Sequence, residues 1–300
     1  MADINLVTSD AEQANTTLSQ RKRFSPYKVR FWTNSAVLNI VLIGLVLLTV
    51  IPFIYMIASA FKHNSEIFGT PITFFPAQPT LENMQALLTQ FPFARWALNT
   101  AVVAVIGTAT AVLLGSLAGF AFAKYNFRFK NILFIIMLTT LLIPYQVTIV
   151  PQFEIIRVLH WFNTYQALIV PRAVTAFGIF LMRQYTMTVP DELLDAARVD
   201  GSSEFGIWWR IVLPLVRPGL AVLGILSFTG LWNDFIWPLV VTTDPSMFVM
   251  NVGISSLVGP YDYQYGILLS GAALASLPVI IMFLFFQRQF LEGLTQGAVK

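Results

Sequence analysis

The residues best suited to bind a small solute lie near position 235, inside an otherwise apolar stretch. Trp232, Asn233, Asp234 and Trp237 fall close together there. This combination is typical of sites for hydroxylated rings, because an aromatic face packs on C–H groups while amide and carboxylate pair with hydroxyls. Asn233 and Trp237 are four residues apart, so in a continuous helix they would share one face. The same residues would also suit an aromatic belt at a membrane interface, with Asp234 hydrated.

A second candidate is the charged stretch 191–218, which separates two apolar runs. Asp191 falls in the first turn of a predicted helix, where the helix dipole favours acids. Gly201 is a natural stop for that helix. Ser202 can cap a second helix, which we expect Pro214 to end. The stretch therefore predicts a helix, a turn and a second helix.

The spacing within this stretch follows a fixed pattern. Asp195-Ala196-Ala197 precedes Gly201 by three residues, and nine residues then lead to Ile211-Val212-Leu213-Pro214. The pattern resembles the cytoplasmic signature loop of binding-protein-dependent ABC importer permeases, in which Glu-Ala-Ala, Gly and Ile-x-Leu-Pro have the same separations. Asp195 stands where that family usually has Glu, one methylene longer. An ordinary pair of helices at the membrane interface is the alternative interpretation.

The resemblance implies one permease subunit of an ATP-driven importer that moves a sugar or related polyol by alternating access. It implies four kinds of partner: a second permease subunit, a dimer of ATP-binding cassette ATPases, an extracytoplasmic solute-binding protein and the lipid bilayer. The ATPases would bind ATP and Mg²⁺, leaving this chain without a cofactor or a catalytic residue. The loop would dock on the ATPase through Ala196, Ala197 and Gly201, with polar contacts around them. The full set of coupling residues implied is Asp195, Ala196, Ala197, Arg198, Asp200, Gly201, Ile211, Leu213 and Pro214.

Two further stretches resemble the carbohydrate permeases of this family. Trp-Asn-x-Phe at 232–235, with Pro238 nearby, resembles their fifth span. The C-terminal run resembles the tail of the maltose and glycerol-phosphate type, where it belongs to the second of two paired permeases. That run consists of Gln287-Arg288, Gly293-Leu294-Thr295 and Gly297-Ala298-Val299-Lys300.

Composition indicates a membrane protein. Hydrophobic residues make up 56% of the 300 positions and charged residues 11%, whereas soluble domains have about 25% charged residues. Because a bilayer needs about 20 apolar residues per helix, we predict an all-α, polytopic transmembrane bundle. Arg172, near the start of one span, is expected to reach the outer interface. The predicted parts are a polar segment 1–30 and one transmembrane domain 31–300, with spans at about 36–60, 97–122, 131–150, 166–184, 218–240 and 265–287.

Basic residues indicate the orientation of these spans. With the N-terminus inside, most of the 18 Lys and Arg residues fall on the inner side. The positive-inside rule then places both termini and the loop 191–218 in the cytoplasm. The family resemblance implies that the membrane is the inner membrane of a bacterium. The net charge of +3 therefore reflects topology, and we expect no nucleic-acid partner.

Small residues recur every four positions along the second predicted span. Such a stripe lets helices approach closely in lipid, where the hydrophobic effect does not drive helices together. We therefore expect this face to pack against another helix, in this chain or in a partner. The stripe consists of Gly107, Ala111, Gly115, Gly119 and Ala123.

Several kinds of chemistry are missing from the sequence. It has no Gly-x4-Gly-Lys-Ser/Thr loop for nucleotide phosphates, no His-Glu-x-x-His helix for zinc and no Gly-x-Ser-x-Gly elbow. Cys is absent, and the two His residues, His63 and His160, are far apart, so we expect no metal site. A membrane-embedded transferase would need a clustered acid or His site. A proton-driven carrier would need ionisable residues deep in several spans, where only Asp234 qualifies.

Overall fold

The computed structural model describes residues 26–257 and 264–296, and side chains within 37–257 and 264–287. The described residues form helices and no strand, which confirms the predicted all-α fold. Contacts divide the chain into two units, residues 1–55 and 56–300. The first contains most of α2 (Pro26–Ser59). The second contains α3 (Asn64–Ile67), α4 (Glu82–Gln90), α5 (Phe93–Lys124), α6 (Lys130–Thr139), η1 (Thr140–Leu142), α7 (Tyr145–Val158), α8 (Tyr165–Ile169), η2 (Val170–Arg172), α9 (Ala176–Met187), α10 (Asp191–Val199), α11 (Glu204–Ile207), η3 (Trp208–Val212), α12 (Leu213–Leu215), α13 (Arg217–Trp232), α14 (Ile236–Val241), η4 (Pro245–Met247), α15 (Met250–Ser255) and α16 (Tyr265–Gln296).

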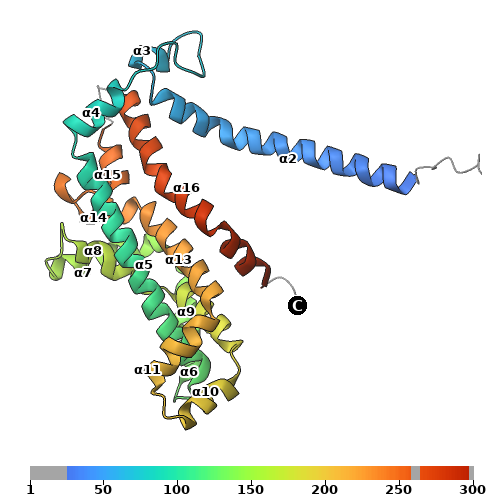
Figure 1. Cartoon of the computed structure of the whole chain (residues 1–300). Helices are drawn as coiled ribbons and strands as arrows, with labels where there is room; N and C mark the ends of the chain where they lie inside the picture. The colour runs from blue at the N-terminus through green and yellow to red at the C-terminus, as the bar shows by residue number, and fades with distance from the viewer. Residues whose placement is uncertain (1–25, 258–263, 297–300) are drawn as a thin grey trace, which may run out of the picture. The chain divides into compact units, whose positions relative to one another are not determined.

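Helix α5 is the centre of the second unit, with α9 and α13 packed along it (Figure 1). The small residues of α5 make this close approach possible. Gly107 faces Leu231 of α13, Gly119 faces Met182 of α9, and Gly115 touches both helices. The stripe therefore packs within this chain. Its members Gly107, Ala111, Gly115 and Gly119 are buried, whereas Ala123 is partly exposed.

The first turns of α5 hold the segment that contains η4. Arg95 Nε donates to the carbonyl of Ser246 (3.2 Å), and Trp96 Nε1 donates to that of Pro245 (3.0 Å). Asn99 is fully buried, and its Nδ2 donates to the carbonyls of Ser246 and Phe248, each at 2.9 Å. These bonds tie one end of α5 to a loop about 150 residues away in sequence.

Residues between α2 and α5 pack beneath the start of α16. Thr80 precedes α4, and its Oγ1 accepts a hydrogen bond from the Glu82 N–H (3.1 Å) at the start of the helix. Asn83 of α4 is buried and donates to the carbonyl of Lys62 (2.6 Å). Gly266 N–H donates to Asn64 Oδ1 (3.0 Å). Helix α4 and the 60–64 segment are thus fixed against α16.

Among the residues that the structure describes, three helices are long and apolar enough to cross a membrane. They comprise Val37–Ser59 of α2, the whole of α5, and Tyr265–Gln287 of α16. The predicted spans 36–60, 97–122 and 265–287 coincide with them. Up to six crossings result if each bent helix pair forms one span. Six spans therefore stay a prediction, which requires each bent pair to be one span.

The other three predicted spans are not continuous helices, which corrects the sequence interpretation. The expected span 131–150 breaks after η1, because Pro144 cannot continue a helix, and α7 leaves at 106° to the preceding helix. The expected span 166–184 bends by 45° before α9, whose start is capped by Thr175 Oγ1. The expected span 218–240 is interrupted between α13 and α14.

Candidate functional site

The stretch 191–218 folds as the predicted helix pair, α10 and α11. Between the helices Gly201 has φ +78°, the left-handed conformation expected for a glycine stop. Its N–H donates to the carbonyl of Arg198 (3.0 Å), and the Ser202 N–H donates to that of Ala197 (2.9 Å). These two bonds close α10 in a Schellman motif. The cap of α11 is Ser203 rather than the predicted Ser202, and its Oγ accepts from the Gly206 N–H.

Pro214 does not end the second helix, contrary to the prediction. The chain widens into a π-turn at η3 and continues through α12, whose last residue is Leu215. In an α-helix the ring of Pro214 would collide with the carbonyl four residues earlier. The π-turn offers a way around that collision, because it wraps the chain with one more residue per turn. The helical segment Glu204–Leu215 then meets α13 at an angle of 84°.

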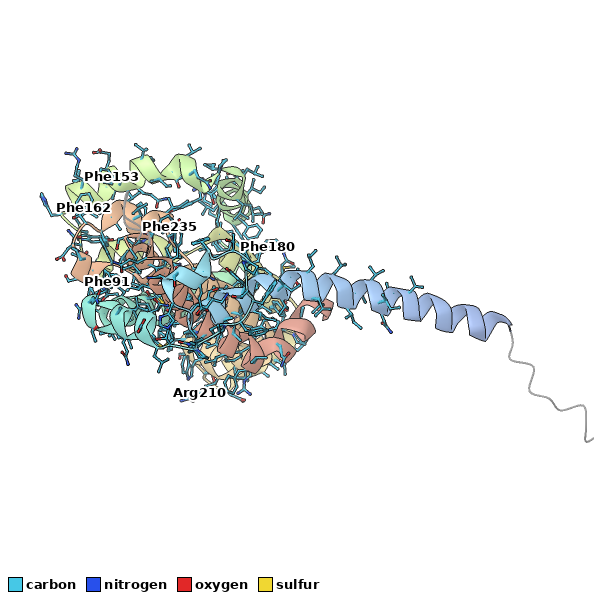
Figure 2. All side chains as sticks on the ribbon, turned by 90° about the horizontal axis from the view of Figure 1, so that it is seen from above. Phe91, Phe153, Phe162, Phe180, Arg210 and Phe235 are labelled. Carbon is cyan, nitrogen blue, oxygen red and sulfur yellow. The ribbon has the colours of Figure 1, made fainter. Side chains whose placement is uncertain are left out.

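The helix pair has one buried face and one exposed face. Leu194, Ala197, Ile207 and Trp208 are buried in a core cluster with residues of α5, α9 and α13. Ala197 therefore belongs to this core and not to a docking surface, which corrects the role expected for it. The exposed side is formed by Asp195, Ala196, Arg198, Asp200, Gly201 and Pro214, while Ile211 and Leu213 are partly buried. Arg210, from the same segment, points away from the helices (Figure 2).

A network of charges links the two short helices to the end of α5. Arg198 Nη1 donates to Asp195 (2.7 Å) and Arg198 Nε donates to Glu204 (2.8 Å). The hydroxyl of Tyr125, just after α5, donates to the same Glu204 carboxylate (2.5 Å). Lys124 donates to Asp191 Oδ1 (2.7 Å). The turn around Gly201 is therefore braced by side chains from both helices and from α5.

These contacts shift the pKa values of the groups that make them. Hydrogen bonds from Arg198 and then from Tyr125 hold the pKa of the Glu204 carboxyl below its ordinary value. Burial, followed by the hydrogen bond to Glu204, raises the pKa of Tyr125 to about 12. The hydrogen bond from Lys124 likewise lowers the pKa of Asp191. At neutral pH Glu204 and Asp191 are therefore ionised, whereas Tyr125 keeps its proton and can donate to Glu204.

Glu204→Gln should destabilise the folded chain at neutral pH by about 1 kcal/mol, a value kept small because the site is solvent-exposed. The pKa of Glu204 is lower in the folded chain than in the unfolded one, so its stabilisation is present above the ordinary carboxyl pKa. It is lost as the pH falls through the lowered folded value. Thermal unfolding in detergent should show a difference between wild type and variant that shrinks on acidification. Glu192→Gln, on the exposed side of α10, is the matched control and should change little. An equal deficit for Glu204→Gln at neutral and acidic pH would refute this assignment.

A cavity of about 660 Å³ lies where the breaks in the apolar spans meet. Arg172 Nη2 lies 3.1 Å from Asp234 Oδ2, and the Arg172 guanidinium lies over the Tyr145 ring at 4.1 Å from its centroid. The Arg172 and Asp234 side chains are 26% and 17% exposed. Arg172 therefore does not extend alone to an interface, as was expected, but forms an ion pair inside the protein. The sequence contains Arg172 and Tyr145 as isolated residues, and no local pattern connects them to Asp234.

The four residues near position 235 are divided by the break in the helix. Asn233 and Asp234 line the cavity. Trp232 is buried and its Nε1 donates to the Ala275 carbonyl (2.9 Å). Trp237 is fully buried and donates to the Ala167 carbonyl (2.8 Å). Asn233 thus follows the end of α13 whereas Trp237 lies in α14, so the shared helix face expected for them is wrong.

Two regions therefore stand out, an exposed helix pair and a polar cavity between broken spans. The matched family is described as "Binding-protein-dependent transport system inner membrane component", and residues 111–295 match it, including both regions. The chain belongs to this family. It is a multi-pass permease of the inner membrane, and this membership does not favour the transferase or proton-driven carrier weighed from the sequence.

Relatives in this family are similar over most of their length. The chain is 38% identical to the "Arabinooligosaccharides transport system permease protein AraQ" of Halalkalibacterium halodurans, over 84% of this chain and 92% of the relative. It is 32% identical to the "Lactose transport system permease protein LacG" of Rhizobium radiobacter, over 84% and 92%. The "sn-glycerol-3-phosphate transport system permease protein UgpE" of Yersinia pestis is also 32% identical, over 86% and 95%.

A solved structure has the same fold. It is the crystal structure of a bacterial ABC transporter involved in the import of the acidic polysaccharide alginate. One of its chains matches with a TM-score of 0.79 at 21% identity, covering 89% of this chain and 99% of that chain. In the part of this chain that the structure describes, no three His, Asp or Glu side chains group to hold a metal ion.

Proposed function

We propose that this permease imports a sugar or related polyol and is driven by ATP hydrolysis in a separate subunit. The observation that carries the proposal is the 38% identity to an arabinooligosaccharide permease over 84% of the chain, with the exposed helix pair in the matched region. Lactose and glycerol-3-phosphate permeases among the relatives support the same class of solute.

The proposed complex contains this chain, a second permease subunit, an ATPase dimer and an extracytoplasmic solute-binding protein. The ATPases bind ATP and Mg²⁺, since the sequence lacks the phosphate-binding loop. Six spans with both termini in the cytoplasm place the helix pair on the ATPase side. The exposed face with Asp195, Ala196 and Arg198 then docks on the ATPase. ATP-driven closure of the dimer moves this face, and the charge network transmits the movement to α5.

The experiment is uptake by the reconstituted complex in liposomes. Arabino-oligosaccharide, lactose and sn-glycerol-3-phosphate are tested as labelled solutes, each with ATP inside and with the binding protein outside. We expect ATP-dependent uptake of at least one of them and no ATP hydrolysis by this chain purified alone. ATP hydrolysis by the purified single chain, or uptake that is independent of ATP, would refute the proposal.

A further inference from the structure

Three interruptions of apolar helices converge on one cavity. Tyr145 begins α7 directly after the first break, Arg172 ends η2 directly before the second, and Asp234 lies in the third. All three side chains line the same cavity. Within a membrane, non-helical backbone is tolerated only where protein buries it or where it lines a cavity. In transporters such paired breaks mark substrate sites.

The polar groups at this point have unused bonding capacity. Arg172 uses Nη2 for Asp234. Its Nε is buried, as is the hydroxyl of Tyr145, and neither has a hydrogen-bond partner among the described residues. Leaving buried polar groups unpaired is costly. Two such groups beside one cavity indicate that a polar ligand supplies their missing hydrogen bonds.

The charge and the walls of the cavity restrict the kind of ligand. Arg172 and Asp234 are the charged residues among those that line it, and they neutralise each other at 3.1 Å. An anionic group would meet a guanidinium that is already paired, and it would lie beside a carboxylate. A sugar hydroxyl both donates and accepts, so it can pair with Asp234 and with Arg172 or Tyr145 at once. Phe177 and Phe235 supply apolar wall for the C–H faces of a ring.

We propose that Tyr145, Arg172 and Asp234 form a binding site within this chain for the hydroxyl groups of a neutral saccharide. This rests on the proposed function, because it assigns a substrate contact to this subunit. Asn233 lines the same cavity and adds an amide at its edge.

The test uses the absence of Cys from this chain. Ser227 lines the cavity, and Ser227→Cys places a single thiol there with little change in size. In membranes that contain the complete complex, we measure how fast a small polar methanethiosulfonate reagent modifies this thiol. The measurement is repeated with arabinotriose and with sn-glycerol-3-phosphate. We expect arabinotriose to slow modification and sn-glycerol-3-phosphate to have little effect.

Variants then assign the protection to individual residues. Arg172→Gln or Asp234→Asn is added to Ser227→Cys. Each should raise the arabinotriose concentration that gives half-maximal protection by roughly 10- to 150-fold, because each removes a hydrogen bond to a charged group. Arg157→Gln is the matched control, because it removes the exposed ion pair with Glu154 (2.7 Å) on α7. It should leave protection unchanged. The double variant Arg172→Met, Asp234→Leu replaces the ion pair with apolar groups of similar size and should assemble without protection.

Each contrary result points to a different failure. If the Ser227→Cys complex imports the saccharide but shows no protection, the site is wrong and the proposed function stands. A thiol that never reacts also overturns the site, because the cavity would then be closed to small solutes. Equal protection by sn-glycerol-3-phosphate overturns the preference for neutral hydroxyls. Protection that survives in the apolar double variant shows that the ion pair is structural. Among the results of these experiments, a wild-type complex that imports none of the solutes contradicts the proposed function itself.

Discussion

Gly201→Val should lower ATP-driven uptake by the reconstituted complex roughly 5- to 150-fold, because valine disfavours the turn between α10 and α11. The backbone there has φ +78°, a region that β-branched residues avoid. Holding such a residue in a strained conformation costs about 1–3 kcal/mol, which lowers the population of the correct turn roughly 5- to 150-fold. The Schellman bonds to Arg198 and Ala197 depend on that turn. The measurement is uptake per assembled complex, with ATPase activity stimulated by the binding protein measured in parallel.

Gly201→Asn is the matched control for this variant. No atom lies within 4 Å of a Cβ built at Gly201, so a Cβ meets no obstacle there and the comparison tests the backbone preference of the two residues. Asparagine enters the left-handed region readily, so it should retain most of the uptake. Two results would contradict this role of the turn geometry in coupling the ATPase to the spans. One is normal uptake by a normally assembled Gly201→Val complex. The other is a loss of uptake in Gly201→Asn as large as that in Gly201→Val.

Gly119→Ala should prevent normal folding of the second unit, although it adds a single methyl group. A Cβ at Gly119 would lie 2.6 Å from Met182 Cβ and 2.8 Å from the Arg183 backbone N. Because two of the atoms in the way belong to the α9 backbone, the helices must separate. Such overpacking costs about 1–3 kcal/mol or more. The measurement is the fraction of chain that remains monodisperse in detergent, followed by thermal unfolding.

Gly224→Ala provides the comparison within the same helix bundle. Its Cβ would lie 3.9 Å from Val112, an ordinary contact. Alanine is the better helix former in the interior of α13, by up to about 1 kcal/mol. This variant should therefore be as stable as the wild type or more so. If the two alanine variants had the same stability, the α5–α9 contact would not depend on the absence of a side chain at position 119.

The features that the sequence predicted well are local ones. The helix pair, the left-handed Gly201 and the close-packed stripe of α5 each depend on residues within one short stretch. Their physical causes, which are backbone sterics and side-chain size, are properties of individual residues. Family membership followed from the same stretch, because its spacing is fixed over 20 positions from Asp195 to Pro214.

The cavity could not be predicted in the same way. Its central residues Tyr145, Arg172 and Asp234 come from three segments that are far apart in sequence. Hydropathy treats each broken span as continuous, because a break of two or three residues hardly changes the average. The face-sharing argument for Asn233 and Trp237 then assumed a helix that the structure interrupts between them. Pro144, Pro171 and Pro238 lie at or near the three breaks, but a proline does not always break a helix, since Pro151 lies inside α7.

Helix α5 also connects the helix pair to the loop around Ser246 as one continuous rod. It runs without a proline from Phe93 to Lys124, a length of about 48 Å at 1.5 Å per residue. At one end of α5, the loop around Ser246 accepts hydrogen bonds from Arg95, Trp96 and Asn99. At the other end, Lys124 donates a hydrogen bond to Asp191 of the helix pair. A rod of this length that tilts by about 5° about one end moves its other end by about 4 Å. In the proposed function, a displacement of about 4 Å at the helix pair would therefore tilt α5 by about 5° relative to the loop around Ser246.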